Sequence, residues 1–321
     1  MLSVLLGGGG GLGWKHGNAK FVRHELAAAT PFYSLLLQDT YSLKCSTSPH
    51  FNFSTCCFKT YCKRSSEEHV THNNNNTPFP QGFSALKQVY NPLESENLWS
   101  SFSLYLFTLH IPFSFGGLSV VSLLTRQPVL DPQTQALSLL IIQILELNGA
   151  LVLFKYTAKP HYKFTNFFKS NKLLNDRNWL VASVLGFGFL VLLIFLTSLL
   201  ADQLFGSKPV NNPILKEILL YSDISRVSCV LAYCIVFPLL EEVVYRGFLL
   251  TSLSSTMEWQ QAVAISSIIF SAIHFSSENF IQLFIIGCVL GCSYCWTGNL
   301  YSSIAIHSLY NALTLLITYY Y

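Results

Sequence analysis

From about residue 97 onward, the chain consists of long apolar runs separated by short polar gaps. Each run is near the roughly 20 residues that an α-helix needs to cross a bilayer, and only 11% of the 321 residues are charged, whereas a soluble domain has about 25%. Backbone polar groups in lipid must be satisfied within their own segment, so such runs fold as helices. The sequence therefore predicts an all-α, polytopic integral membrane helix bundle. We expect about seven transmembrane segments, at about 98–124, 134–156, 178–203, 225–254, 259–275, 279–297 and 299–319.

Three cysteines near the C-terminus, Cys288, Cys292 and Cys295, have a spacing that in a loop could indicate an iron–sulfur site. Here they lie in FIIGCVLGCSYCW and form one stripe of a predicted buried helix, where cysteine behaves as a small hydrophobic residue. Gly287 and Gly291 in the same stretch have the spacing of a close helix–helix contact. We therefore interpret this segment as a packing surface.

The N-terminal part has a different composition. Residues 1–65 contain seven Lys or Arg and two acidic residues, and they are rich in Ser. This composition is typical of an organellar transit peptide, and a disordered tail is the alternative. Residues 66–96, with four consecutive Asn, are interpreted as a polar linker.

Three ionisable residues interrupt the apolar run FPLLEEVVYRGFLL: Glu241, Glu242 and Arg246. An ionisable residue at the centre of a membrane helix costs about 2.5 to 3.5 kcal/mol, and such residues usually face a bundle interior or a water-filled cavity. Glu242 and Arg246 are four positions apart, so they share a helix face and can pair. A buried ion pair that fixes helix packing would account for these two residues, but Glu241 is rotated by about 100° and stays available.

Two further polar groups follow on the next predicted helices. His274 lies near the end of SSIIFSAIHFSS, with Phe270 one turn before it on the same face. His307 and Asn311 share a face in SSIAIHSLYNALTLL. Taken singly, each histidine fits a packing or interfacial role, and polar contacts between membrane helices contribute about 0.6 kcal/mol on average.

Taken together, a carboxylate, two histidines and an amide are the groups that water-dependent hydrolysis needs. The carboxylate serves as base, a histidine holds and polarises the water, and the remaining donors stabilise an oxyanion. Glu241, His274 and His307 could equally ligate one divalent metal such as zinc, with a position open for water. A serine or cysteine nucleophile is less convincing because no nucleophile elbow is present.

The order and spacing of these residues resemble the three motifs of the CPBP intramembrane metalloprotease family. This family includes the type II CAAX prenyl endopeptidases and the bacteriocin-processing and immunity proteins. The resemblance covers about residues 225–320 and rests on Glu241-Glu242-x3-Arg246, Phe270-x3-His274 and His307-x3-Asn311.

The resemblance implies a role for each residue. Glu241 would activate the attacking water together with His274, and His307 and Asn311 would stabilise the tetrahedral oxyanion. It also implies three supporting residues, Glu242, Arg246 and Phe270. The expected domain organisation is a transit peptide (1–65), a linker (66–96), N-terminal transmembrane helices (97–224) and catalytic transmembrane helices (225–321).

We therefore expect an intramembrane endopeptidase that acts on membrane proteins or peptides within a lipid bilayer. The N-terminal composition fits a plant chloroplast-type member, in the thylakoid or inner envelope membrane. The small net charge of +3 is scattered, and no nucleic-acid-binding pattern is present. One alternative is a non-proteolytic membrane scaffold or protective partner that retains the polar core. A transporter is a more distant alternative, because no inverted repeat is visible, and we expect Gln143 and Glu146 to be polar contacts between helices.

Overall fold

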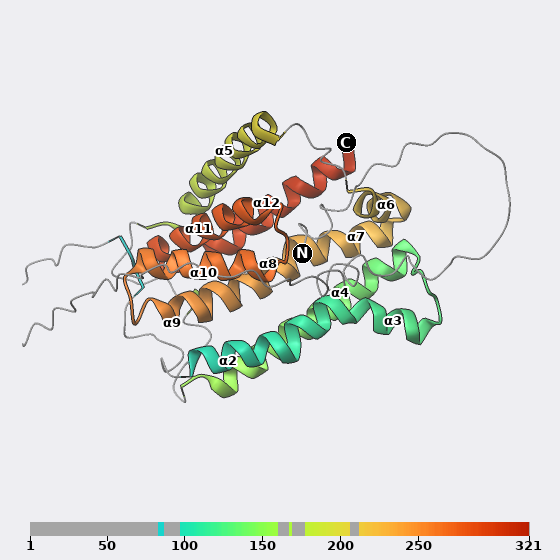
Figure 1. The fold of residues 1–321 in the computed structure, drawn as a ribbon, viewed down its shortest axis with the longest axis horizontal. Helices are drawn as coiled ribbons and strands as arrows, with labels where there is room; N and C mark the ends of the chain where they lie inside the picture. The colour runs from blue at the N-terminus through green and yellow to red at the C-terminus, as the bar shows by residue number, and fades with distance from the viewer. Residues whose placement is uncertain (1–82, 87–96, 160–166, 169–176, 206–211, 321) are drawn as a thin grey trace, which may run out of the picture. The chain divides into compact units, whose positions relative to one another are not determined.

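The computed structural model of the chain describes residues 83–86, 97–159, 167–168, 177–205 and 212–320. Within these ranges, the secondary-structure elements are all helices (Figure 1). The predicted transit peptide (1–65) and most of the predicted linker (66–96) lie outside the described residues, and both stay predictions. The all-α fold class is confirmed.

The helices are joined into longer units by π-helical turns, which are labelled η. In chain order the elements are α2 (Leu98–Tyr105), η2 (Leu106–His110), η3 (Pro112–Gly116), α3 (Gly117–Thr125), α4 (Pro132–Thr157), α5 (Trp179–Phe205), α6 (Pro213–Tyr221), α7 (Asp223–Leu231), η6 (Ala232–Val236), α8 (Phe237–Glu241), η7 (Glu242–Leu250), α9 (Thr251–Leu253), α10 (Trp259–Ile273), α11 (Phe280–Thr297) and α12 (Leu300–Tyr320).

Six helical units of the described chain are long and apolar enough to cross a membrane: Leu98–Thr125, Pro132–Thr157, Trp179–Ala201, Asp223–Leu253, Phe280–Thr297 and Leu300–Tyr320. Where the sequence indicated about seven spans, the described residues contain these six candidate spans and one shorter apolar helix. The segment expected at 259–275 forms α10, which has only 15 residues. At 1.5 Å per residue, α10 is about 22 Å long, whereas the hydrocarbon core of a bilayer is about 30 Å thick.

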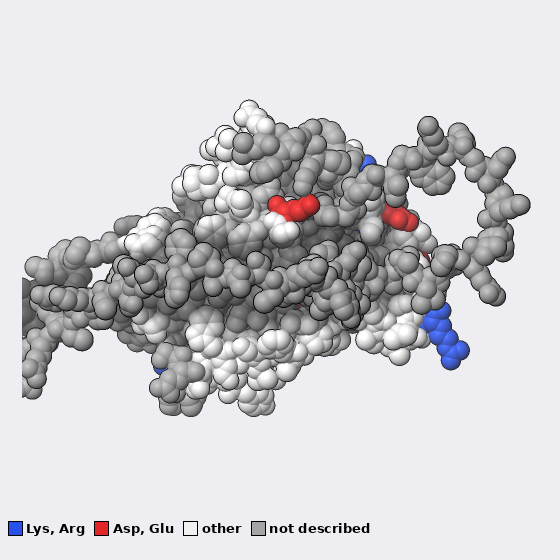
Figure 2. All heavy atoms as spheres, viewed as in Figure 1, with Lys and Arg blue, Asp and Glu red and all other residues white. Residues whose placement is uncertain are grey.

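The outer faces of these helices are apolar and exposed. On α5, Val184 and Leu185 are 70% and 67% exposed, and Leu123 and Leu124 on α3 are each 78% exposed. Few of the described residues in the space-filling view are Lys, Arg, Asp or Glu (Figure 2). Apolar surface on this scale is rare on soluble monomers, and the chain is an integral membrane protein.

The starts of three helices follow from local sequence. Asp131 precedes α4 and accepts hydrogen bonds from the backbone N–H groups of residues 133 and 134. Asn212 caps α6 in the same way, and Ser222 caps α7. A Pro stands at the first position of both α4 and α6, where its missing N–H costs nothing.

The most extensive helix packing in the described part of the chain is between α10 and α11, and the two glycines identified in the sequence lie in this contact. A Cβ atom on Gly287 would lie 2.9 Å from the Cβ of Ser267, and one on Gly291 would lie 3.1 Å from Val263. Cys295 is fully buried in the same core. The interpretation of this stretch as a packing surface is confirmed. α11 also packs on α5 and α12, so it lies at the centre of the C-terminal helices.

Candidate active site

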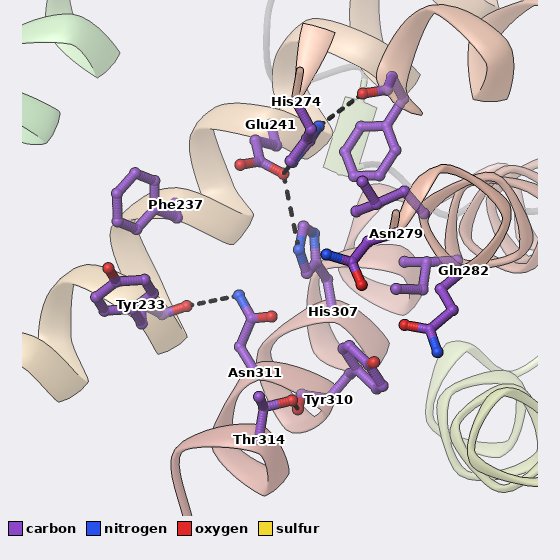
Figure 3. A pocket seen from close by; sticks show the side chains of 13 residues that line it. Tyr233, Phe237, Glu241, His274, Asn279, Gln282, His307, Tyr310, Asn311 and Thr314 are labelled. Atoms are coloured by element: carbon purple, nitrogen blue, oxygen red, sulfur yellow. Dashed lines mark hydrogen bonds and ion pairs between the residues drawn. The ribbon is translucent and has the colours of Figure 1, made fainter. Parts of the chain in front are cut away.

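Three of the predicted site residues meet at one point, although they come from three separate helices. Glu241 ends α8, His274 directly follows α10, and His307 lies in the middle of α12. The Glu241 Oε2 atom lies 3.8 Å from His274 Nε2 and 3.7 Å from His307 Nε2 (Figure 3). The three side chains are only 12%, 8% and 7% exposed. The proximity expected from the sequence is therefore present.

The hydrogen bonds of the two imidazoles fix which ring nitrogen carries the proton. His274 Nδ1 lies 2.6 Å from the carbonyl oxygen of Phe270, which can only accept a hydrogen bond, so Nδ1 is the donor. His307 Nδ1 lies 2.9 Å from Glu242 Oε1 and donates to that carboxylate. In the neutral rings, both Nε2 atoms therefore present a lone pair towards Glu241.

Three hydrogen-bond acceptors converge as a result, and none of them can donate to the others. Separations of 3.7 and 3.8 Å are too long for direct hydrogen bonds but suit a bridging water. Glu241 Oε2 has no hydrogen-bond partner among the described residues. All three side chains line a cavity of about 70 Å³, which is enough for at least one water.

A buried ion pair between Glu242 and Arg246 contacts this cluster through His307. Arg246 Nη1 lies 2.9 Å from Glu242 Oε1, and these two side chains are 1% and 0% exposed. Arg246 also donates to the Gly287 carbonyl through Nη2 at 3.3 Å, and its guanidinium lies 4.6 Å above the ring of Phe270. The same ring packs against His274 in a tilted arrangement, with centroids 4.5 Å apart. The predicted Glu242–Arg246 pair and the shared face of Phe270 and His274 are both confirmed.

Asn311 lines the same cavity, and its amide is anchored by a feature of the backbone. Its Nδ2 atom donates to the carbonyl of Tyr233 at 2.8 Å. The N–H of Phe237 bonds to the carbonyl five residues earlier, that of Ala232. In this register the next N–H would serve Tyr233, but residue 238 is proline and has none. Asn311 therefore donates a hydrogen bond to the Tyr233 carbonyl, which Pro238 cannot do. This bond uses one of the two N–H groups of the Asn311 amide.

A second polar cluster lies on the N-terminal helices, outside the three motifs. Glu146 on α4 is fully buried, accepts a hydrogen bond from the Tyr105 hydroxyl at 2.9 Å and lies 2.8 Å from His110 Nδ1. The expectation of a polar contact between helices is confirmed for Glu146. It is wrong for Gln143, whose amide nitrogen and oxygen have no hydrogen-bond partner within the described ranges.

Sequence reasoning missed Tyr105 and His110 as members of this cluster, because their partner lies on a helix about 40 positions away. It also missed the contribution of the Tyr233 carbonyl. The signal for that carbonyl was present in Pro238, but it could be read only with the π-helical register known. Asn279 and Gln282 at the start of α11, which we had not singled out, line the wall of the cavity opposite Tyr233 (Figure 3).

The predicted metal ligands, Glu241, His274 and His307, lie close together in the structure. No group of three or more His, Cys, Asp or Glu side chains in the described part of the chain is arranged to hold a metal ion. The metal site at Glu241, His274 and His307 stays a prediction.

One known protein family matches the part of the chain that contains these site residues. Residues 223–313 match the model of the Rce1-like family, described as type II CAAX prenyl endopeptidase Rce1-like. These residues are therefore similar to a CAAX-endopeptidase domain. The matched range contains all three motifs, so the resemblance to the CPBP proteases is confirmed there. Among curated proteins and solved structures, none matches the chain significantly.

Proposed function

We propose that this chain is an intramembrane endopeptidase that hydrolyses peptide bonds of membrane-associated proteins with a water activated by Glu241. The observation that carries the proposal is the convergence of the Glu241 carboxylate and two imidazole Nε2 atoms in a small buried cavity. The similarity of the same residues to a CAAX-endopeptidase domain supports it, and it makes membrane proteins the natural substrate class.

In the proposed reaction, a water donates one hydrogen to Glu241 Oε2 and the other to His274 Nε2. As the water oxygen attacks the peptide carbonyl carbon, its first proton passes to Glu241 and the carbonyl oxygen becomes an oxyanion. Collapse of this intermediate breaks the C–N bond, and Glu241 returns the proton to the leaving amine. The second hydrogen of the water stays on the new carboxyl group, and no other reactant is needed.

Asn311 and His307 are proposed to stabilise the oxyanion in different ways. The N–H of Asn311 that is not bonded to Tyr233 can donate to the oxyanion directly. His307 already gives its Nδ1 proton to Glu242, so its neutral form has no second proton to donate. Only the imidazolium form of His307, with a proton on Nε2, can therefore stabilise the oxyanion.

The experiment that tests the proposal uses purified chain reconstituted in proteoliposomes with internally quenched apolar peptides. Wild type should cleave at least one peptide, and Glu241→Gln should lower kcat by about 10²-fold or more, because a general base typically contributes 10²- to 10⁴-fold. Glu258→Gln is the matched control, because Glu258 is exposed and makes no side-chain cap to α10. Equal cleavage by wild type and Glu241→Gln would refute the proposal, and the scaffold alternative would then account for the chain.

We also propose a plastid membrane, thylakoid or inner envelope, as the location. The acid-poor, basic and Ser-rich composition of residues 1–65 supports this proposal. A fusion of residues 1–65 to a fluorescent reporter should enter chloroplasts and be shortened there. A reporter that stays outside chloroplasts at full length would contradict the proposed location.

A further inference from the structure

A second cavity, of about 180 Å³, reaches the catalytic carboxylate. Glu241 and His274 line this cavity as well as the smaller one. Its other walls come from the η2–α4 region, from α6 and the η6–η7 region, and from the end of α10, and most of them are apolar. The cavity therefore connects the proposed reacting water to a space that a substrate could fill.

The wall on α4 contains an unusual polar residue, Gln143. Its side chain lines the cavity and is 1% exposed. Neither Nε2 nor Oε1 has a hydrogen-bond partner among the residues that the structure describes. Burying an unpaired amide is destabilising, and native proteins leave few such groups. A leucine of similar volume at this position would avoid that cost, so the amide requires an explanation other than packing.

We propose that Gln143 is a substrate-positioning residue that binds one backbone peptide group of the substrate, while an adjacent apolar side chain occupies the cavity. This inference rests on the proposed function. A secondary amide complements Gln143 on both sides: its carbonyl accepts from Nε2 and its N–H donates to Oε1. A hydrocarbon chain would satisfy neither atom, so the amide of Gln143 favours a peptide.

The size and charge of the cavity narrow the substrate further. An apolar cavity of about 150 Å³ holds one benzene-sized group, so about 180 Å³ accommodates one large side chain such as Phe or Leu. The carboxylate of Glu241 lines this space, which places an acidic substrate side chain beside a like charge. The preferred substrate therefore carries a large apolar residue close to the cleaved bond and no acidic residue there.

The test measures binding separately from hydrolysis, in full-length chain carrying Glu241→Gln. The probes are fluorescein-labelled apolar octapeptides with Phe, Leu or Ala at one central position, and their binding to the protein in nanodiscs is measured by fluorescence anisotropy. Adding Gln143→Leu should weaken the Kd of the Phe and Leu peptides about 10-fold. Asn148→Leu, which removes an exposed carboxamide from the same helix, is the matched control and should leave Kd unchanged.

Two further readouts separate substrate positioning from a structural role. Gln143→Leu should not lower the Tm, since it removes an unpaired buried amide. Replacing the backbone amide next to the central Phe by an ester should weaken binding to the Gln143 protein and leave binding to Gln143→Leu unchanged. These results would support peptide binding by Gln143 even if wild type cleaved no peptide. A lack of cleavage would refute only the proposed hydrolysis. No peptide binding, an unchanged Kd in Gln143→Leu, or a lowered Tm with unchanged Kd would overturn it.

Discussion

Breaking the buried ion pair behind the active site should separate stability from activity. Glu242 and Arg246 are 0% and 1% exposed, and their charged atoms are 2.9 Å apart. Glu242→Leu leaves Arg246 buried without its carboxylate, and removing one partner of a buried pair typically costs about 3 to 5 kcal/mol. For a bundle of this size, such a loss lowers the Tm by on the order of 10 °C.

The double variant Glu242→Leu/Arg246→Leu should recover most of that stability, because apolar residues of similar volume often replace a buried pair without loss. Activity should not return. His307 Nδ1 donates to Glu242 at 2.9 Å, so the double variant still lacks the group that orients this ring. Tm in detergent and peptide cleavage in proteoliposomes measure the two quantities on the same preparation.

Recovery of both Tm and activity in the double variant would refute this reasoning, because Glu242 would then act only through helix packing. A Tm that stays low in the double variant would contradict the assigned cost of the unpaired Arg246. The single variant Arg246→Leu provides the complementary control, because it leaves the contact between Glu242 and His307 in place.

Three other predictions follow from separate parts of the structure. Gly287→Ala should lower the Tm, since its Cβ would lie 2.9 Å from the Cβ of Ser267 and 3.0 Å from the Cα of that residue, and overpacking costs about 1 to 3 kcal/mol. Gly188→Ala on α5, where nothing lies within 4 Å, should not lower the Tm, because Ala favours a helix over Gly. Hydrogen bonds from Thr134 hold the pKa of the Asp131 carboxyl below its usual range, so the capping stabilisation is present at neutral pH and is lost as pH falls through that pKa. Asp131→Ala should therefore lower the Tm at pH 7 more than at pH 3, and an equal loss at both would contradict the cap. Because the proposed reaction uses only the Glu241 carboxylate and the two imidazoles, EDTA or 1,10-phenanthroline should leave peptide cleavage unchanged, and loss of cleavage restored by added zinc would overturn the metal-free scheme.

Much of the candidate site could be predicted from the sequence, because an ionisable residue in an apolar helix is costly and therefore informative. Glu241, His274 and His307 each stand out in their segments without any knowledge of tertiary structure. The i,i+4 spacing of Glu242 and Arg246 likewise indicates a pair that the structure contains. Hydropathy placed the six long helices within a few residues of their observed bounds.

The remaining features depend on contacts between distant helices or on backbone register. The apolar run at 259–275 was expected to be a span because hydropathy reports apolar character more accurately than helix length. The helix itself, α10, ends at Ile273, directly before His274. The anchoring of Asn311 depends on the π-helical register before Pro238, which local sequence does not specify. Gln143 and Glu146 lie three positions apart on α4, but only the packing of α2 and η2 beside that helix gives Glu146 its partners.

The most direct measurement compares the N-termini and C-termini of membrane proteins by mass spectrometry. The samples are membranes that contain either wild-type chain or Glu241→Gln at matched abundance. The account predicts a set of termini that appears only with wild type, with large apolar residues near the cleaved bonds. Identical termini in both samples, with Glu241→Gln still correcting any defect caused by loss of the protein, would contradict the claim that Glu241 activates water for proteolysis.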